Sequence, residues 1–437
     1  METGTGRLSP AATGGGDAQL GSVLAALLEA SHQAAPWDVP ALVREAGRAL
    51  GLGEARVFLA DVQQRLLVPM PEPAPPISGP DVPSGEPSPP EARTRGRDVG
   101  DSDVGESGAG LDVDGTLAGR AYRTERLHRG AGPTPECWVP LVDGIERIGV
   151  LRVHPGANAS APMEDRARAL ASLVTLVLGS KSTFSDAIVR TTRTRPMSLQ
   201  SELLWAFVPP RTIGTRRVTS SAVLEPAYEV AGDAFDHSLA GDVLHVTVVD
   251  AMGHDLASGG ASAVALAACR STRRAGGSLA DITTAIDDTL NEWIPDRLLT
   301  TVLADLDTVT GRLSWVNCGH PAPLLIRAGT VVPGALERRP HPPLGIGLRP
   351  GPPEVNRLRL QPGDRILIHT DGVTEARSTE GDLFGEHRLV DHIVRHTATG
   401  QPAPETLRRL MHALVVHQDH RLRDDATAVL IDWHPGP

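Results

Sequence analysis

The sequence has few cysteines, few aromatic residues, no long apolar run and no excess of basic charge. Three cysteines, Cys137, Cys269 and Cys318, stand far apart in 437 residues. Their odd number and wide spacing fit neither a disulfide framework nor a zinc finger, and a reducing compartment fits best, so we expect a cytoplasmic protein. Because aromatic residues make up only 3% of the chain, leucine, valine and alanine must fill its cores.

The missing apolar runs and the missing basic charge exclude two further classes of protein. Apolar stretches such as residues 173–178 are far shorter than the roughly 20 residues that cross a bilayer. The first ten residues lack the basic start and apolar run of a secretory signal. The formal net charge is −11, whereas nucleic-acid affinity depends on basic groups that neutralise phosphates. We therefore expect neither a membrane nor a nucleic-acid partner.

A segment rich in Pro, Gly, Ser and Asp, residues 69–115, interrupts the N-terminal half. It has almost no apolar periodicity and cannot bury enough surface to offset chain entropy, so we predict a disordered loop. Helical patterns precede it at residues 20–30 and 39–50, and the strand-like run ARVFLADV follows them. After the loop, Asp143-Gly144 separates two alternating apolar runs, which is typical of a β-hairpin.

These elements predict a small α+β domain over residues 19–180, after a disordered start at residues 1–18. The stretch AGRAYRTE…WVPLVDGIERIGVLRV resembles the last helix and strands of a GAF-type sensor domain. No residue in this stretch marks a ligand. A small-molecule sensor and a structural module without a ligand therefore both remain open.

Residues 181–216 read as a helical linker. A helical pattern runs over residues 164–194, Pro196 interrupts it, and a second short helix follows. Packing against the next domain and a dimerising or signal-carrying role would bury the same apolar face, so both interpretations stay open. The apolar stripe of this second helix consists of Leu199, Leu203, Leu204 and Phe207.

The C-terminal half repeats one design, in which an apolar strand ends at an acidic or glycine-containing turn. A hairpin of the same half ends in Asn317 and His320. Taken singly, each aspartate is ordinary turn chemistry. The acidic positions are Asp233 and Asp236 in PAYEVAGDAFDH, Asp250 in VLHVTVVDAMGHD, Asp371 in GDRILIHTDGVTEAR, and Asp424 and Asp425 in DDATAVLID.

If these strand ends converge, the carboxylates repel one another and their pKa values rise. No matching group of Lys and Arg accompanies the segments. Hard divalent cations would balance the charge, and ligands that are all oxygen favour Mg²⁺ or Mn²⁺ over zinc. Two such cations can share a water, lower its pKa towards ~7 and assist an in-line phosphoryl transfer.

The motifs GDxxD, DxMGH, NxGHxxPLLI, LGI, GDxxLxxTDGVTEA and DDAT follow in this order over residues 217–433. In type and order they resemble the motifs of the SpoIIE-like branch of the PP2C (PPM) phosphatases. The resemblance implies an α+β fold in which two antiparallel sheets pack between helices, a four-layer α-β-β-α sandwich. It also implies a metal-dependent protein serine/threonine phosphatase that binds two divalent cations, Mn²⁺ or Mg²⁺.

The resemblance also assigns roles to single residues. Asp250 would bridge both cations, and the backbone carbonyl of Ala251 would bind one of them. Asp371 and Asp424 would hold the other cation, while Asp233 would act mainly through metal-bound water. Asp236 and Asp425 are expected nearby without an assigned role.

Three further positions follow from the same comparison of motifs. Gly253 and Gly372 match turn glycines of the family, where a side chain would obstruct the backbone conformation. Asp255 stands where the family usually has glycine, and we expect it to add negative charge beside the site.

The resemblance implies a phosphorylated anti-sigma-factor antagonist of the STAS type as the substrate, in bacterial partner switching, with a separate kinase reversing the reaction. The apolar stripe of the linker leaves room for a homodimer formed through the linker helices. Two alternatives remain. One is a zinc or iron hydrolase that uses His254, His320 and His369, although no HExxH-like spacing is present. The other is a pseudo-phosphatase that only binds phosphoproteins or a partner.

Overall fold

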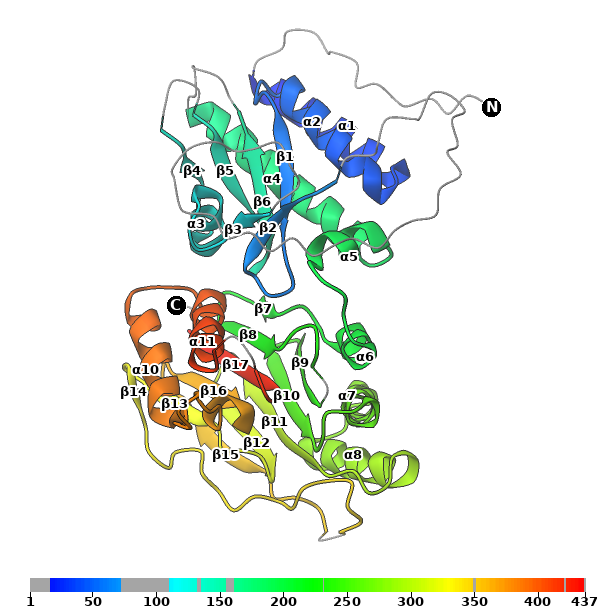
Figure 1. Ribbon diagram of the computed structural model, residues 1–437, viewed down its shortest axis with the longest axis vertical. Helices are drawn as coiled ribbons and strands as arrows, with labels where there is room; N and C mark the ends of the chain where they lie inside the picture. Colours follow the sequence, from blue (N-terminus) through cyan, green and yellow to red (C-terminus); the bar gives the residue numbers. More distant parts are fainter. Residues whose placement is uncertain are drawn as a thin grey trace.

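The computed structural model describes residues 16–71, 110–131, 135–154, 161–230, 232–348, 351–419 and 422–435. In Figure 1 an N-terminal part with one sheet lies above a C-terminal part with two sheets. Most of the predicted disordered loop, residues 72–109, and the start of the chain, residues 1–15, lie outside the described residues.

The N-terminal part contains one antiparallel sheet in the order β3-β2-β1-β6-β5-β4. Its strands are β1 (Ala55–Ala60), β2 (Leu66–Pro69), β3 (Leu111–Asp112), β4 (His128–Arg129), β5 (Cys137–Asp143) and β6 (Glu146–Val153). Its helices are α1 (Gly16–Gln33), the short 3₁₀ helix η1 (Pro36–Asp38), α2 (Val39–Ala49), α3 (Leu117–Thr124) and α4 (Ala161–Ser182).

Strand periodicity divides the core of this part into two. Along β6, Leu151 packs with α2 and α4, whereas its neighbour Val150 faces the small cluster around Tyr122 of α3, as expected because successive side chains of a strand point to opposite faces. The predicted hairpin is confirmed, because β5 pairs with β6 and Gly144 has φ +63°. The predicted loop is wrong at its C-terminal end, where Leu111 and Asp112 pair with β2. The GAF-like resemblance stays a prediction.

The C-terminal part is a sandwich of two antiparallel sheets, in the orders β15-β12-β11-β10-β9 and β14-β13-β16-β17-β8-β7. The first sheet has β9 (Asp233–Ala240), β10 (Val243–Ala251), β11 (Leu299–Asp307), β12 (Arg312–Cys318) and β15 (Asn356–Arg359). The second has β7 (Thr212–Gly214), β8 (Val218–Glu225), β13 (Leu324–Arg327), β14 (Thr330–Val331), β16 (Arg365–His369) and β17 (Ala426–Trp433).

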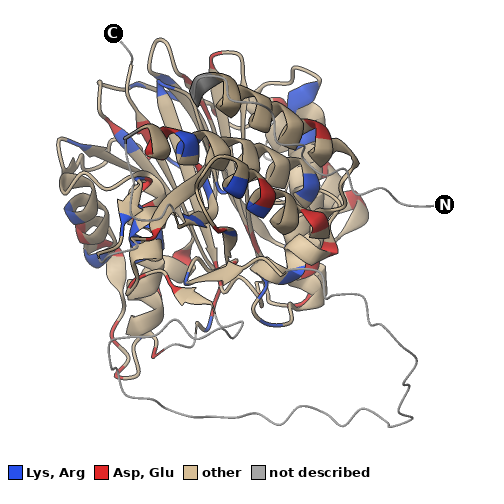
Figure 2. Ribbon diagram, turned by 90° about the horizontal axis from the view of Figure 1, so that it is seen from above, with Lys and Arg blue, Asp and Glu red and all other residues tan. Residues whose placement is uncertain are grey.

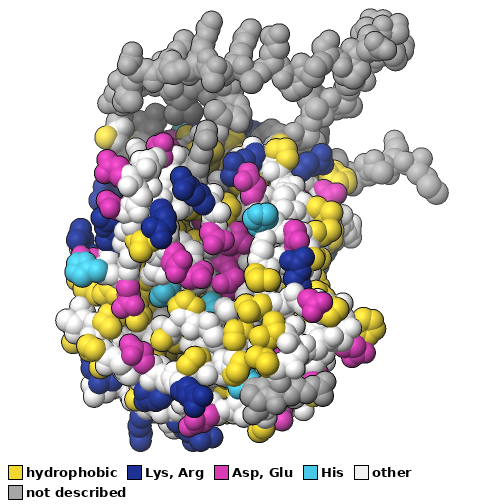
Figure 3. Space-filling model, turned by 60° about the horizontal axis from the view of Figure 1, so that its bottom comes forward, with side chains coloured by type: hydrophobic (Ala, Val, Ile, Leu, Met, Phe, Trp, Pro, Cys, Tyr) yellow, Lys and Arg dark blue, Asp and Glu magenta, His cyan; other side chains and the backbone are white. Residues whose placement is uncertain are grey.

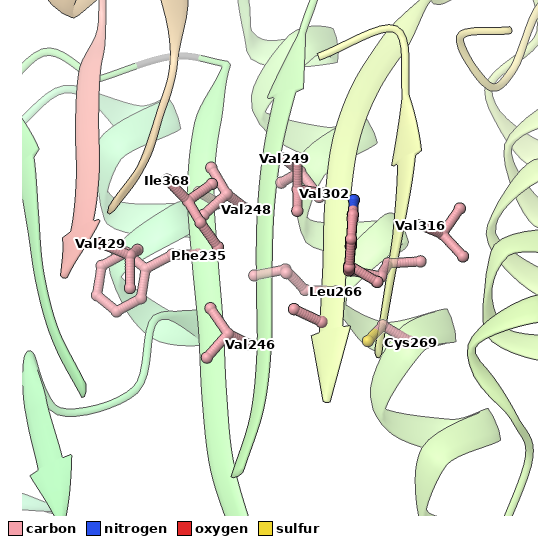
Figure 4. Packing of buried hydrophobic residues seen from close by; sticks show 14 of the residues in the cluster. Phe235, Val246, Val248, Val249, Leu266, Cys269, Val302, Val316, Ile368 and Val429 are labelled. Carbon is pink, nitrogen blue, oxygen red and sulfur yellow. The ribbon is translucent and has the colours of Figure 1, made fainter. Parts of the chain in front are cut away.

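Helices cover both outer faces of the sandwich. Helices α7 (Leu256–Arg274) and α8 (Leu279–Trp293) pack on the first sheet, and α10 (Gly385–Ala398) and α11 (Ala403–His417) pack on the second. The short α9 (Asp371–Thr374) follows β16. Figure 4 shows the apolar layer between the sheets, where Phe235 and Val248 of one sheet meet Ile368 and Val429 of the other. The predicted four-layer α-β-β-α arrangement is confirmed.

Two helices connect the parts, α5 (Asp186–Thr192) and α6 (Leu199–Phe207). Helix α6 packs on the C-terminal part, where Leu204 is fully buried and Trp205 Nε1 donates a hydrogen bond to the Ala227 carbonyl over 2.7 Å. These contacts support the packing interpretation of the apolar stripe. Within the segment predicted as linker, β7 already pairs with β8. The homodimer stays a prediction.

A buried group of charges joins the two parts. Arg147 of β6 donates a hydrogen bond to Glu405 of α11 over 3.1 Å, and both side chains are 2% exposed. Arg408 donates to Glu405 and to Asp114, so each of these carboxylates has an arginine partner. We call Asp114, Arg147, Glu405 and Arg408 the interdomain cluster.

Along the ribbon in Figure 2, the positions of Lys and Arg are interspersed with those of Asp and Glu. Among the described residues, the helices are all too short or too polar to cross a bilayer.

Candidate metal centre

The alternation of β9 and β10 brings two of the predicted aspartates side by side. Asp233 is the first residue of β9 and lies directly opposite Asp250, near the end of β10. Asp250 follows Val246 and Val248 on the face that packs on the second sheet, because residues two apart share a face. Both carboxylates therefore sit at the end of the apolar layer between the sheets.

The second sheet supplies the groups that hold Asp233 in place. Thr370, which follows β16, donates its hydroxyl to Asp233 Oδ2 over 2.8 Å. The Thr427 backbone N–H of β17 donates to the same hydroxyl oxygen over 3.0 Å. Asp425 Oδ2 accepts hydrogen bonds from the backbone N–H groups of Gly232, over 2.7 Å, and Asp233, over 3.2 Å. The second sheet thus fixes both the side chain and the backbone of Asp233.

The remaining two predicted aspartates approach from the same second sheet. Asp371 begins α9 directly after β16, and Asp424 lies two residues before β17. Both are exposed, whereas Asp233 is buried and Asp250 is half-buried. In Figure 3 acidic side chains line a hollow in this face of the molecule. The order of depth is Asp233, then Asp250, then the two exposed carboxylates at the rim.

Burial and the repulsion between neighbouring carboxylates raise the pKa values of Asp233 and Asp250. Burial, together with the charges of Asp371, Asp424 and Asp425, raises the pKa of Asp250 to about 7. Burial and the charges of Asp250 and Asp425 raise the pKa of Asp233 well above its usual range. Burial also raises the pKa of Asp424. The carboxylates are therefore close enough for their charges to interact.

Positive charge does not compensate this cluster within the described part of the chain. There, Asp233, Asp250, Asp371 and Asp424 form no ion pair within 4 Å. We call these four residues the acidic cluster. A set of oxygen donors with excess negative charge fits hard divalent cations such as Mg²⁺ or Mn²⁺. In the same described part, no three acidic, histidine or cysteine side chains already converge as metal ligands.

Two glycines allow the backbone to approach the cluster. Gly253, three residues after Asp250, has φ +103°, a conformation that side chains disfavour, so the predicted backbone requirement is present there. Gly372 does not have a positive φ. A Cβ at this position would instead lie 1.8 Å from the carbonyl oxygen of Asp425, so that glycine permits close packing of α9 on the start of β17.

Two acidic residues that the sequence placed near the site have other partners. Asp236 is three residues after Asp233, so it points to the opposite face of β9, where it forms ion pairs with Arg270 and Arg273 of α7. Burial would raise the pKa of Asp236, but the hydrogen bonds from these arginines lower it. Asp255 caps α7 through the Ser258 N–H and pairs with Arg297. Its negative charge is therefore neutralised by a neighbour.

The three histidines beside the motifs divide into one exposed and two buried side chains. His320 Nδ1 lies 2.8 Å from the Thr300 hydroxyl, and burial lowers its pKa to about 3. His369 donates from Nδ1 to the carbonyl oxygen of Thr370 over 3.0 Å, and burial lowers its pKa as well. His254 is exposed. His369 contacts the backbone of the next residue and His320 contacts a hydroxyl of β11, and these contacts favour a structural role for both buried rings.

Sequence reasoning missed the parts that Thr370 and Asp425 play in holding the site. Thr370 directly precedes Asp371 in the TDG motif, and its position after a buried strand was the available signal. Asp425 was expected nearby without a role, and it instead fixes the backbone that leads into Asp233. Both connect the two sheets at the point where the carboxylates meet.

Comparison with protein families places part of this chain beside a known family. Residues 240–434 match the family described as Stage II sporulation protein E (SpoIIE). The match includes Asp250, Asp371 and Asp424 but begins after Asp233.

Among curated proteins, Protein IcfG of Synechocystis sp. is 28% identical over 128 residues, which is 29% of this chain. The matched region spans only 19% of the length of that relative.

Solved structures similar to this chain include two bacterial proteins. The RsbU and RsbW domains of Rv1364c from Mycobacterium tuberculosis are 23% identical, with a TM-score of 0.44 over 52% of this chain and 63% of that one. The SiaA-PP2C domain of Pseudomonas aeruginosa is 23% identical, with a TM-score of 0.43 over 49% of this chain and 85% of that one. These likenesses are too remote to assign an activity.

Proposed function

We propose that the protein is a PP2C-type (PPM) protein serine/threonine phosphatase that depends on divalent cations, because its residues 240–434 match the SpoIIE family. The observation that carries the proposal is the acidic cluster, in which burial and the charges of neighbouring carboxylates together raise the pKa of Asp250 to about 7. Carboxyl groups whose pKa values are shifted in this way, without a positive partner, are typical of functional sites.

Asp250, Asp371, Asp424 and the backbone carbonyl of Ala251 are the groups that would hold two divalent cations, with Asp233 contributing through water. When bound, these cations would activate a water molecule and neutralise the charge of a phosphate group. Thr370 and Asp425 keep Asp233 and its backbone in place through hydrogen bonds from the second sheet. The hollow is open to solvent, as phosphorylated side chains of a protein require.

The substrate of the proposed reaction is a phosphoserine or phosphothreonine on a protein. The resemblance of the motifs supports a STAS-type anti-sigma-factor antagonist as that protein. The N-terminal part and its linker would then control the phosphatase, and the contacts of α6 with the C-terminal part and the interdomain cluster give it two physical connections.

The experiment is phosphate release from p-nitrophenyl phosphate and from a phosphoserine peptide, with Mn²⁺ or with EDTA. We expect Mn²⁺-dependent release by the wild type and a loss of about 10³-fold in Asp250→Asn, since metal-assisted stabilisation is worth several kcal/mol. The matched control is Asp242→Asn, which removes an exposed carboxylate at the other end of β10 and should leave the rate unchanged.

Calorimetric titration with Mn²⁺ gives a readout that is independent of turnover. The wild type should bind Mn²⁺, and Asp250→Asn and Asp424→Asn should bind it more weakly, because each substitution removes a charged oxygen ligand. Activity that survives in Asp250→Asn would favour the histidine-based hydrolase. A wild type that binds phosphoproteins and hydrolyses none would favour the pseudo-phosphatase.

A further inference from the structure

Large apolar side chains are exposed on the segments next to the acidic cluster. The first two belong to the chain that leaves Asp250, namely Met252, which is 53% exposed, and Leu256, which is 48% exposed. The others lie at the end of α8 and in the loop that packs on it. They are Trp293, Ile346 and Leu348, which are 70%, 38% and 53% exposed.

Backbone contacts show that these segments are neighbours. The Met252 N–H donates to the Leu298 carbonyl over 2.9 Å, so the turn after Asp250 lies on the segment that follows α8. A Cβ on Gly260 of α7 would lie 3.9 Å from Ile294, the residue after Trp293. The first turns of α7 therefore pack against the end of α8.

The loop with Ile346 and Leu348 is fixed to the same place. The backbone N–H groups of Gly345 and Gly347 donate to the side chains of Asp287 and Asn291 on α8, each over 2.8 Å. Gly345 has φ +78°, and a Cβ there would lie 2.3 Å from the Arg297 carbonyl oxygen. Because the backbone of the loop is anchored on both sides of Ile346, its apolar side chain is held in an outward position.

These five side chains belong to neighbouring segments beside the hollow, and together we call them the apolar rim. Figure 3 shows hydrophobic side chains gathered directly beside the acidic hollow. Single exposed apolar residues are common on soluble proteins, but a contiguous group of them marks a surface for another molecule. The rim consists of Met252, Leu256, Trp293, Ile346 and Leu348.

We propose that the apolar rim binds the segment of the substrate protein that flanks the phosphorylated residue, and that this segment carries apolar side chains. The inference rests on the proposed function, which brings a phosphorylated side chain into the hollow. A chain that enters there must continue over its edge, and the rim begins two residues after Asp250. The exposed side chains of the rim are apolar, so apolar and uncharged flanking residues fit this surface.

The test compares three substrates with one double variant. The substrates are p-nitrophenyl phosphate and two phosphoserine peptides of equal length and charge, one with Leu and Phe beside the phosphoserine and one with Ser and Gly. The variant is Trp293→Ala combined with Leu348→Ser, which leaves the acidic cluster intact. The control is Leu176→Ser on α4, a side chain that is also exposed but lies in the N-terminal part.

We expect the wild type to have a kcat/KM about 10-fold higher for the apolar peptide than for the polar one, because burying one large apolar side chain accounts for a factor of this size. The double variant should lose this preference through a higher KM. Its rate on p-nitrophenyl phosphate should stay within about twofold of the wild type, as should every rate of the control. Retained aryl phosphatase activity also shows that the variant is folded.

Three outcomes would overturn the proposal. The first is equal kcat/KM for the two peptides in the wild type, and the second is an unchanged KM for the apolar peptide in the double variant. The third is a change from dimer to monomer in sedimentation of the double variant without any change in KM, which would make the rim a contact between two copies of this chain. A wild type that fails on all three substrates would instead contradict the proposed phosphatase activity.

Discussion

The acidic cluster and the interdomain cluster each contain a buried carboxylate, but the charged neighbours of the two carboxylates have opposite signs. Glu405 is buried between the two parts, and burial alone would raise its pKa, but hydrogen bonds and charge from Arg408 and Arg147 lower it. Asp233 is equally buried, and the neighbouring charges that act on it are carboxylates that raise its pKa further. Removing one partner from a buried carboxylate–arginine pair leaves a costly unpaired charge, whereas carboxylates that gather without arginine partners are typical of a functional site.

The largest effect should come from removing the central carboxylate of the interdomain cluster. Glu405→Ala would leave the buried guanidinium of Arg147 without its carboxylate, and Arg408 would keep only the half-exposed Asp114. We expect a loss of about 3–5 kcal/mol in the free energy of unfolding, because an unpaired buried charge is costly. Urea unfolding followed by circular dichroism measures it. A loss below about 1 kcal/mol would show that water compensates these arginines.

A second effect concerns a buried charge with a single acidic partner. His245 Nδ1 lies 2.8 Å from Asp305, and although burial alone would lower its pKa, the hydrogen bond to Asp305 helps raise the pKa to about 9. The folded pKa exceeds the unfolded value of about 6.5. The resulting stability is therefore fully present below pH 6.5 and is lost as the pH rises through 9.

The size of this pH effect is at most about 3 kcal/mol, and less because Asp305 is partly exposed to solvent. The measurement is the urea midpoint of the wild type and of Asp305→Asn between pH 6 and pH 10. The stability difference between the two proteins should shrink as the pH rises. A difference that stays constant over this range would mean that His245 is neutral throughout.

A third substitution should raise the free energy of unfolding, whereas Glu405→Ala in the interdomain cluster should lower it. Asp250→Asn removes one of several mutually repelling carboxylates, so the variant in EDTA should be more stable than the wild type by about 1 kcal/mol. Addition of Mn²⁺ should then raise the melting temperature of the wild type and leave that of the variant nearly unchanged. If the variant melts below the wild type in EDTA, the carboxylates of the acidic cluster do not destabilise the folded protein by repulsion.

The smallest change in the free energy of unfolding should come from removing a solvent-screened ion pair. This change gives a baseline for the other three. Glu164 contacts Arg168 one turn further along α4 over 3.0 Å, and the Arg168 side chain is about half exposed. Glu164→Gln should change the free energy of unfolding by less than about 1 kcal/mol, since solvent screens such pairs. The same urea experiment measures it. A larger loss would mean that its second partner, Arg129, contributes more than an exposed pair does.

Much of the fold could be predicted because local patterns determine it. The hairpin at Asp143-Gly144 depends on a turn that glycine permits, and the strands that end at Asp250 and Asp371 are apolar runs with clear boundaries. The approach of Asp250, Asp371 and Asp424 followed from the order of the motifs together with the resemblance to a known family. Their assignment as metal ligands remains a prediction that the titrations above would test.

Other features could not be predicted because they depend on which strand faces and helices meet. Asp236 is near Asp233 in the sequence, yet the alternation of β9 points it at Arg270 and Arg273. Asp255 also lies near the motifs, and Arg297, 42 residues away, neutralises it. Proximity in the sequence was therefore a poor guide to the membership of the acidic cluster.

The sequence by itself determined the positions of the strands, the turns at their ends and the supply of acidic side chains at those turns, because hydrophobic periodicity and turn chemistry act over a few residues. The tertiary structure decided which carboxylates acquire a positive partner. Arg147 and Glu405 are separated by 258 residues and meet only because the N-terminal sheet packs on α11. Charge compensation depends on distances between atoms, and only the folded chain fixes those distances.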